Sequence, residues 1–172
     1  LRIYGYEHIG ATNLRGETTQ GGVSPMKALK NRIIRLLTGM GYLEIMNYSF
    51  TGVKEIQKLG LPEGDLRNDP MPIRNPLGED TAVMRPTLVC DMCKTLAFNM
   101  NHSTESASLY EMAAVFDHHH PTEEGLPTET QTLCLGAYGA EVDFFTVRTA
   151  VEAILRMGGI SCEVEAGGDC YY

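Results

Sequence analysis

Few residues in this chain have the chemistry of a catalytic or metal site, and each group also has a structural explanation. Cys90 and Cys93 form a C-x-x-C pair, but no second pair follows at the spacing of a four-ligand zinc site. Their helical spacing places Cys93 on or near an apolar face, which favours buried thiols over metal or redox use. His118, His119 and His120 could bind a metal or act as a base. Three adjacent side chains cannot all point one way from an ordinary turn or strand, so a solvated loop is favoured.

One carboxylate interrupts an apolar strand pattern. Glu111 lies within Leu109–Phe116, where a buried carboxylate needs a hydrogen-bond partner. It could be a catalytic acid, but a structural anchor or an edge position is favoured. The run Gly136–Gly139 lacks the spacing and the lysine of a phosphate-binding loop. Since no Ser-His-Asp set, H-E-x-x-H motif or paired acidic motif occurs, the sequence offers no self-contained catalytic machinery.

Helical periodicity predicts three long helices to position these groups. Ser24 and Pro25 give the first a capped start, and Gly39 and Gly41 end it. Its apolar positions recur at Leu29, Ile33, Leu36, Leu37 and Met40. Arg85-Pro86 is predicted to open the second, with an apolar face of Leu88, Met92, Leu96 and Met100, flanked by Val89 and Cys93. Asp143 is predicted to cap the third, with inward positions Phe144, Val147, Val151, Ile154 and Leu155.

The strand pattern predicts an α+β domain. Leu43–Phe50 is apolar on both faces and is therefore predicted to be an interior strand. Leu109–Phe116 and Gln131–Tyr138 are predicted to pair as an antiparallel hairpin across a polar loop. Cys162–Glu165 is predicted to form one more short strand. Because the two late strands have no helix between them, the expected sheet is mainly antiparallel, with helices packed on it.

Composition and charge narrow the possible functions. The 172 residues suit one domain, 43% of them are hydrophobic, and no apolar run approaches the ~20 residues of a membrane span. An odd, scattered set of five cysteines favours reduced thiols and a cytoplasmic protein. The net charge is -8, and no Lys or Arg occurs between Lys94 and Arg148. That half is therefore a poor candidate for holding RNA or a nucleoside triphosphate, although a simply acidic, solvated surface is an equal alternative.

The stretch Arg74–Val89 resembles a signature of one protein family. Two prolines and a glycine break it, which predicts a strand end, a fixed Asn-Pro loop and an Arg-Pro turn into a helix. It resembles, with other segments in the same order, the beta subunit of bacterial phenylalanyl-tRNA synthetase. The segments are 2–9, 41–50, 75–77, 84–88, 109–111, 115–116 and 143–145. The positions that match the family are Asn75, Pro76, Arg85, Pro86, Asn99, Glu111 and Phe144.

The resemblance implies a domain plan and a fold. Residues 1–9 would be the tail of a preceding B5-like domain, 10–23 a linker, and 24–172 a truncated catalytic-like module. Its fold would be a class II aminoacyl-tRNA synthetase-like antiparallel sheet flanked by helices. A working class II site needs an arginine on its motif 2 hairpin, and the matching hairpin lies in the window without Lys or Arg. No glycine-rich motif 3 ending in arginine occurs through Tyr172. We therefore expect no catalytic, cofactor-binding or metal-binding residue in this chain.

The resemblance also implies partners. The parent enzyme would use ATP and Mg²⁺, bind tRNA(Phe), and combine two alpha with two beta chains in the cytoplasm without a membrane. This module would pack on the alpha subunit, and Leu29, Ile33, Leu36 and Met40 are the hypothetical interface. The alternative is that these residues only pack in the hydrophobic core of this chain. Two other functions stay open: a metal- or partner-binding module using Cys90, Cys93 and the histidines, and an active adenylate-forming synthetase paralogue.

Overall fold

The computed structural model describes residues 2–18 and 20–165. Cys170 and the end of the predicted module, 166–172, lie outside the described residues. The α-helices are α1 (Pro25–Gly39), α2 (Val53–Gln57), α3 (Val89–Asn101) and α4 (Phe144–Met157). The strands are β1 (Leu43–Glu44), β2 (Phe50–Thr51), β3 (Val83–Met84), β4 (Ala107–Asp117) and β5 (Thr128–Tyr138). Short 3₁₀ helices are η1 (Tyr6–His8), η2 (Leu66–Asn68) and η3 (Glu79–Thr81).

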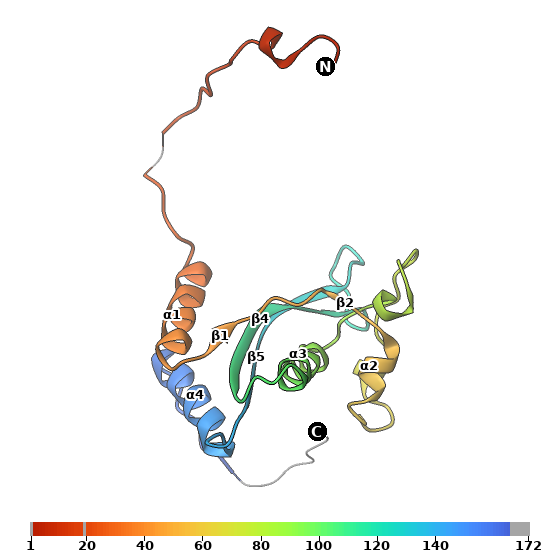
Figure 1. Cartoon of the computed structure of the whole chain (residues 1–172), viewed down its shortest axis with the longest axis vertical. Helices are drawn as coiled ribbons and strands as arrows, with labels where there is room; N and C mark the ends of the chain where they lie inside the picture. The colour runs from red at the N-terminus through yellow and green to blue at the C-terminus, as the bar shows by residue number, and fades with distance from the viewer. Residues whose placement is uncertain (1, 19, 166–172) are drawn as a thin grey trace.

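The β4–β5 hairpin is the centre of the fold (Figure 1). Its antiparallel pairing, with Tyr110 opposite Leu135 and Glu111 opposite Cys134, confirms the predicted hairpin. β1 adds to the other edge of β4 in parallel, which makes the order β1-β4-β5. β2 and β3 form a separate small antiparallel sheet. The chain is therefore an α+β domain with a mainly antiparallel sheet.

Helices lie against both faces of the hairpin. On one face, a Cβ at Gly136 would meet Leu96 and Met92 of α3 at 2.8 Å, so this glycine lets α3 approach the sheet closely. On the other face, Tyr110 packs with Leu37 of α1 and Ala150 of α4. Figure 1 shows α1 and α4 side by side at one end of the sheet. A second core of Ile56, Val83 and Cys90 joins α2 and β3 to α3.

Capping residues fix the starts of two helices as the sequence predicted. Ser24 Oγ accepts a hydrogen bond from the Lys27 backbone N–H at 3.3 Å, and Pro25 opens α1. Asp143 forms a reciprocal capping box with Thr146 at the start of α4. Both predictions are confirmed because a cap depends only on residues within one turn of the helix.

The N-terminal segment lies apart from the folded body. Apart from η1, residues 2–18 and 20–23 form no helix or strand, and nearly all are exposed. In Figure 1 this segment arches away from α1. Its division into a domain tail and a linker stays a prediction. Among the described residues, no helix is long and apolar enough to cross a membrane.

The prediction that Leu43–Phe50 forms one interior strand is wrong. Only its ends are strands, and they belong to different sheets. β1 lies at a sheet edge, and the side chains of Met46 and Tyr48 are 92% and 82% exposed. The ladder stops after the Ile45 N–H bonds to the Tyr110 carbonyl, because the next donor, Asn47 N–H, bonds to the Glu111 side chain instead.

The predicted helix start at Arg85-Pro86 is also wrong. α3 begins at Val89. Arg85 lies between β3 and α3 and bridges two segments: its N–H donates to the Ser49 carbonyl and its carbonyl accepts from the Phe116 N–H, both at 3.0 Å. The residue before a proline is disfavoured in helical geometry, which suits the position of Arg85 outside the helix.

Several burial predictions fail as well. On α4, Phe144 is 67% exposed and Val151 is 38% exposed. On α3, Met100 is 55% exposed and Cys93 lies at the surface. Helical spacing identifies a stripe on a helix, but the width and length of the covering element decide how much of it is buried. Cys162–Glu165 forms no strand, since it has no neighbouring strand to pair with among the described residues.

The close approach at Gly136 can be tested by adding one methyl group. Gly136→Ala should lower the free energy of unfolding by about 1 to 3 kcal/mol, because the new Cβ overpacks the contact with Met92 and Leu96. Urea unfolding followed by circular dichroism measures the change. Gly39→Ala is the matched control, since no atom lies within 4 Å of its added Cβ. Equal stability of Gly136→Ala and the parent chain would contradict the packing.

Candidate functional site

A buried ion pair joins the Arg85-Pro86 turn to the central hairpin. Arg85 is 2% exposed and Glu111 is 1% exposed. The Arg85 Nη1 and Glu111 Oε1 atoms are 2.8 Å apart. Two charges so far from water are tolerated only when they pair and their remaining hydrogen-bonding atoms are also satisfied.

Neighbouring groups supply further hydrogen bonds to both charges. Arg85 Nε donates to the Ala114 carbonyl at 3.0 Å, and Nη1 donates to the Tyr48 carbonyl at 3.3 Å. Asn47 donates to Glu111 twice, from its backbone N–H at 3.1 Å and from Nδ2 at 2.9 Å. The Asn47 side-chain oxygen accepts from Thr95 Oγ1 of α3 at 3.1 Å. This buried polar node (Asn47, Arg85, Thr95 and Glu111) thus links the 47–48 segment, the turn, α3 and β4.

The node explains Glu111 without catalysis. Both carboxylate oxygens accept hydrogen bonds from protein groups, and the side chain is buried. Its arrangement therefore suits a structural anchor. Sequence reasoning missed Asn47 and Thr95. A signal for Asn47 was present, since it is a polar residue inside the otherwise apolar Leu43–Phe50 stretch.

The other family positions are spread over the fold. Asn75 and Pro76 lie in an exposed loop, which is closed by the hydrogen bond from Ile73 N–H to the Ala82 carbonyl at 2.9 Å. Asn99 stays within α3, where Nδ2 donates to the Thr95 carbonyl at 2.8 Å. Phe144 is exposed at the start of α4. The structure therefore brings Arg85 and Glu111 together but gathers no wider site from these residues.

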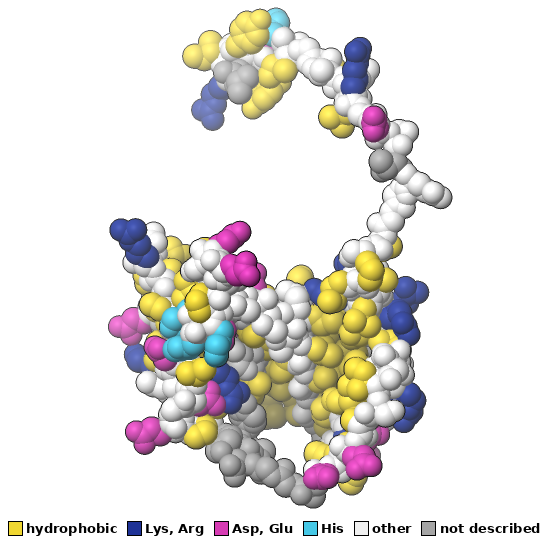
Figure 2. All heavy atoms as spheres, turned by 180° about the vertical axis from the view of Figure 1, so that it is seen from behind, with side chains coloured by type: hydrophobic (Ala, Val, Ile, Leu, Met, Phe, Trp, Pro, Cys, Tyr) yellow, Lys and Arg dark blue, Asp and Glu magenta, His cyan; other side chains and the backbone are white. Residues whose placement is uncertain are grey.

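The proposed interface residues of α1 divide into two groups. Leu29 and Met40 are each 37% exposed, whereas Ile33 packs against the core of its own chain and Leu36 is half-buried. In Figure 2, hydrophobic side chains gather in the middle of the rear face, and Lys and Arg side chains line one edge of the molecule. On the sheet, the half-buried residues that pack against the same core are Met112, Leu133 and Leu135.

The hairpin contributes no cation of its own. β4 and β5 lie within the window that holds no Lys or Arg. A lysine does reach the hairpin from α1, because Lys30 Nζ donates to Gln131 Oε1 on β5. Among the described ion pairs, Lys30 has no carboxylate partner. Its hydrogen bond goes to the neutral side-chain amide of Gln131. The strands thus lack the arginine that a motif 2 hairpin would use to hold a phosphate.

The two cysteines of the C-x-x-C pair lie in different environments. Cys90 is buried, and burial raises the pKa of its thiol to about 11. Cys93 is exposed, which corrects the prediction that both thiols are buried. A thiol with such a high pKa is a poor nucleophile and a poor metal ligand at neutral pH, because both roles need the thiolate.

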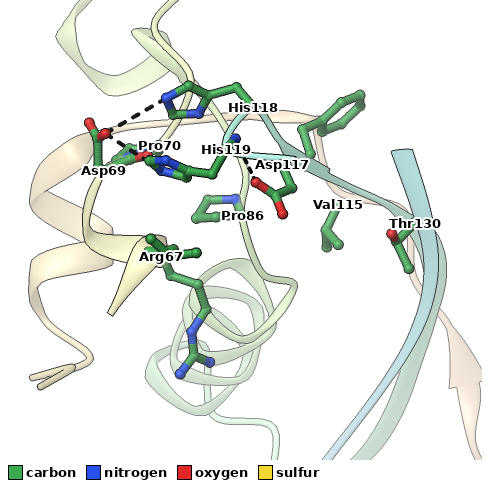
Figure 3. A pocket seen from close by; sticks show the side chains of 11 residues that line it. Arg67, Asp69, Pro70, Pro86, Val115, Asp117, His118, His119 and Thr130 are labelled. Atoms are coloured by element: carbon green, nitrogen blue, oxygen red, sulfur yellow. Dashed lines mark hydrogen bonds and ion pairs between the residues drawn. The ribbon is translucent and has the colours of Figure 1, made fainter. Parts of the chain in front are cut away.

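The histidine run is not a simple solvated loop, which corrects the sequence prediction. His118 and His119 are partly buried and line a pocket with Asp69, Asp117 and Pro86 (Figure 3). Their Nε2 atoms lie 3.7 Å and 3.5 Å from Asp69 Oδ2. The Nδ1 atom of His120 pairs instead with Asp117 Oδ2 at 2.7 Å. Asp69 comes from a distant segment, so adjacent sequence could not reveal it.

Comparison with solved structures defines the class of fold. The chain superposes on a pyrrolysyl tRNA synthetase of Desulfitobacterium hafniense with a TM-score of 0.60 over 80% of this chain and 46% of that one. The identity is 12%, so this similarity concerns the fold alone. The fold is thus class II synthetase-like.

The family follows from sequence. Residues 9–171 match the family described as "Phenylalanyl tRNA synthetase beta chain CLM domain", and the chain belongs to it. It is 35% identical over 162 residues to the phenylalanine--tRNA ligase beta subunit of Clostridium acetobutylicum, covering 93% of this chain and 20% of that protein. The corresponding subunit of Halalkalibacterium halodurans is 32% identical over 176 residues, covering 95% and 21%. The chain therefore spans about a fifth of the length of these relatives.

Breaking the buried ion pair should cost much of the stability of the domain. Arg85→Met should lower the free energy of unfolding by about 3 to 5 kcal/mol, because Glu111 is left as an uncompensated buried charge. Urea unfolding measures the loss. Lys54→Met is the control, since the Lys54–Glu79 pair is exposed and its loss should leave the midpoint nearly unchanged. The double variant Arg85→Met/Glu111→Leu should be less destabilised than the sum of the single variants; strict additivity would contradict the coupling.

A second buried carboxylate predicts a pH dependence. Asp91 is 6% exposed, its Oδ2 has no hydrogen-bond partner among the described residues, and burial raises its pKa against the lowering influence of Lys94 and Arg85. The folded state therefore binds this proton more tightly than the unfolded state, and stability is lost as the pH rises through the raised pKa. Asp91→Asn should remove that loss, so its stability relative to the parent chain should increase as the pH rises above the ordinary pKa of an aspartate. Unfolding curves that shift in parallel with pH for both proteins would contradict this.

Proposed function

We propose that the chain is a non-catalytic structural module of a phenylalanyl-tRNA synthetase beta subunit. In this proposal it supports the ATP-dependent aminoacylation of tRNA(Phe) by packing on the alpha subunit within a heterotetramer of two alpha and two beta chains. The observation that carries the proposal is a class II-like hairpin without a single Lys or Arg. Such a hairpin has no cation of its own with which to stabilise a transferring phosphate.

The chemistry of the parent enzyme would then lie on another chain. ATP and Mg²⁺ would be bound by the alpha subunit, and tRNA(Phe) would be bound by the assembled complex. Residues 1–9 would close a preceding B5-like domain, 10–23 would be the linker, and 24–172 would be the module. No observation favours an active adenylate-forming paralogue, because the family match and the cation-free hairpin both point to the beta chain.

The first helix is the best candidate for the surface that meets the alpha subunit. Leu29 and Met40 expose more than a third of their surface although they continue the apolar stripe of α1. Ile33, which lies between them, packs against the core of this chain, so we assign it to the core and not to the interface. An exposed apolar edge beside a packed core is a surface that gains free energy when a partner covers it.

Mixing the chain with the alpha subunit of a relative tests the interface. Light scattering should detect a complex with the parent chain, and Leu29→Asp and Met40→Asp should weaken binding at least about tenfold, because each places a charge in an apolar contact. Both sites are partly exposed, so the variants should keep the circular dichroism spectrum of the parent chain. Met100→Asp on α3 is the matched control, since α3 lies on the opposite face of the sheet. Equal weakening by all three substitutions, or by none, would contradict α1 as the interface.

Pyrophosphate exchange tests the absence of catalysis. The chain alone, supplied with ATP, Mg²⁺ and phenylalanine, should exchange no labelled pyrophosphate into ATP. The assembled alpha and beta chains of a relative serve as the positive control. Clear exchange by this chain alone would overturn the proposal in favour of an active synthetase paralogue.

A further inference from the structure

Three potential metal ligands from two distant segments meet at the end of the hairpin. His118 and His119 follow β4 directly, and Asp69 follows η2 about fifty residues earlier in the chain. One ligand atom from each residue lies within 4.8 Å of the others. Figure 3 shows both imidazole rings turned towards the Asp69 carboxylate.

The spacing of these atoms suits a small ion. A tetrahedral ion with bonds of about 2.1 Å holds its ligand atoms about 3.4 Å apart. Asp69 Oδ2 lies 3.7 Å from His118 Nε2 and 3.5 Å from His119 Nε2. The two imidazole nitrogens lie within 4.8 Å of each other, and His119 Nε2 is also 3.1 Å from the Asp69 carbonyl oxygen, so side-chain rotations would have to bring the three atoms to bonding distance.

Other contacts hold the ligands in place. The His119 backbone N–H donates to Asp117 Oδ1 at 2.8 Å, and Asp117 Oδ2 pairs with His120 at 2.7 Å. The two ligand rings lie with their centroids 4.1 Å apart. Asp69 is exposed, which leaves an open side for water as a further ligand. The side chain of Arg67 points away from the histidines and pairs with Asp65 at 2.7 Å, so it does not occupy the place of a cation.

We propose that Asp69, His118 and His119 bind a divalent transition metal ion, with Zn²⁺ the best fit. Imidazole nitrogens favour such ions, whereas Mg²⁺ prefers a shell of oxygen ligands. The ion would tie the turn after η2 to the end of β4 and so restrain the loop of the hairpin. The site is independent of packing on the alpha subunit, since its ligands all come from one chain.

Isothermal titration of the full chain with Zn²⁺ alone tests the site. The parent chain should bind one ion saturably, and its Tm should rise with Zn²⁺ concentration because the ion binds only the folded arrangement. Asp69→Asn and His119→Asn should each weaken binding by more than about tenfold. Mg²⁺ should cause neither heat nor a shift in Tm.

His120→Asn is the matched control, because His120 belongs to the same run but faces Asp117. It should bind Zn²⁺ within a few-fold of the parent chain. Circular dichroism in the absence of metal verifies that each variant is folded. The proposal is overturned if the parent chain binds no Zn²⁺ saturably, or if His120→Asn loses as much affinity as His119→Asn while Asp69→Asn loses none.

Discussion

The buried pair of Arg85 and Glu111 is the constraint on which the rest of the structure depends. Neither charge can stay in the interior without the other, and neither is satisfied by the other alone. Their remaining hydrogen bonds come from Asn47 and Tyr48 in the segment after β1 and from Ala114 on β4. Folding these segments together is therefore a condition for burying the pair, and the pair in turn fixes how they cross.

This constraint accounts for two irregular features of the fold. The segment after β1 leaves the sheet because Asn47 bonds to the Glu111 side chain instead of continuing the ladder. Arg85 stays outside the helix, and α3 begins only at Val89, because the backbone of Arg85 bridges Ser49 and Phe116. The node thus connects β4 to the segment that follows β1 and to the turn that precedes α3. A network of this kind suits a module whose proposed task is to brace an active site on another chain.

The remaining features are consistent with a scaffold that carries little chemistry of its own. The central hairpin has the class II-like arrangement but no cation, and the thiol of Cys90 is inert because burial raises its pKa. Unused apolar surface stays on α1 at Leu29 and Met40. The histidines after β4 are the exception, since they meet Asp69 in a geometry that metal binding can use.

The sequence by itself determined the features that depend on near neighbours and on family motifs. These are the caps at Ser24 and Asp143, the β4–β5 hairpin, and the family that the Arg74–Val89 stretch indicated. Only the tertiary structure decided which partner each buried or exposed side chain meets. Glu111 pairs with Arg85 and accepts a hydrogen bond from Asn47, and His119 lies beside Asp69. Met46 and Tyr48 remain exposed. The physical reason is that periodicity reports which face of an element a residue occupies, whereas burial and pairing depend on segments that are distant in the sequence.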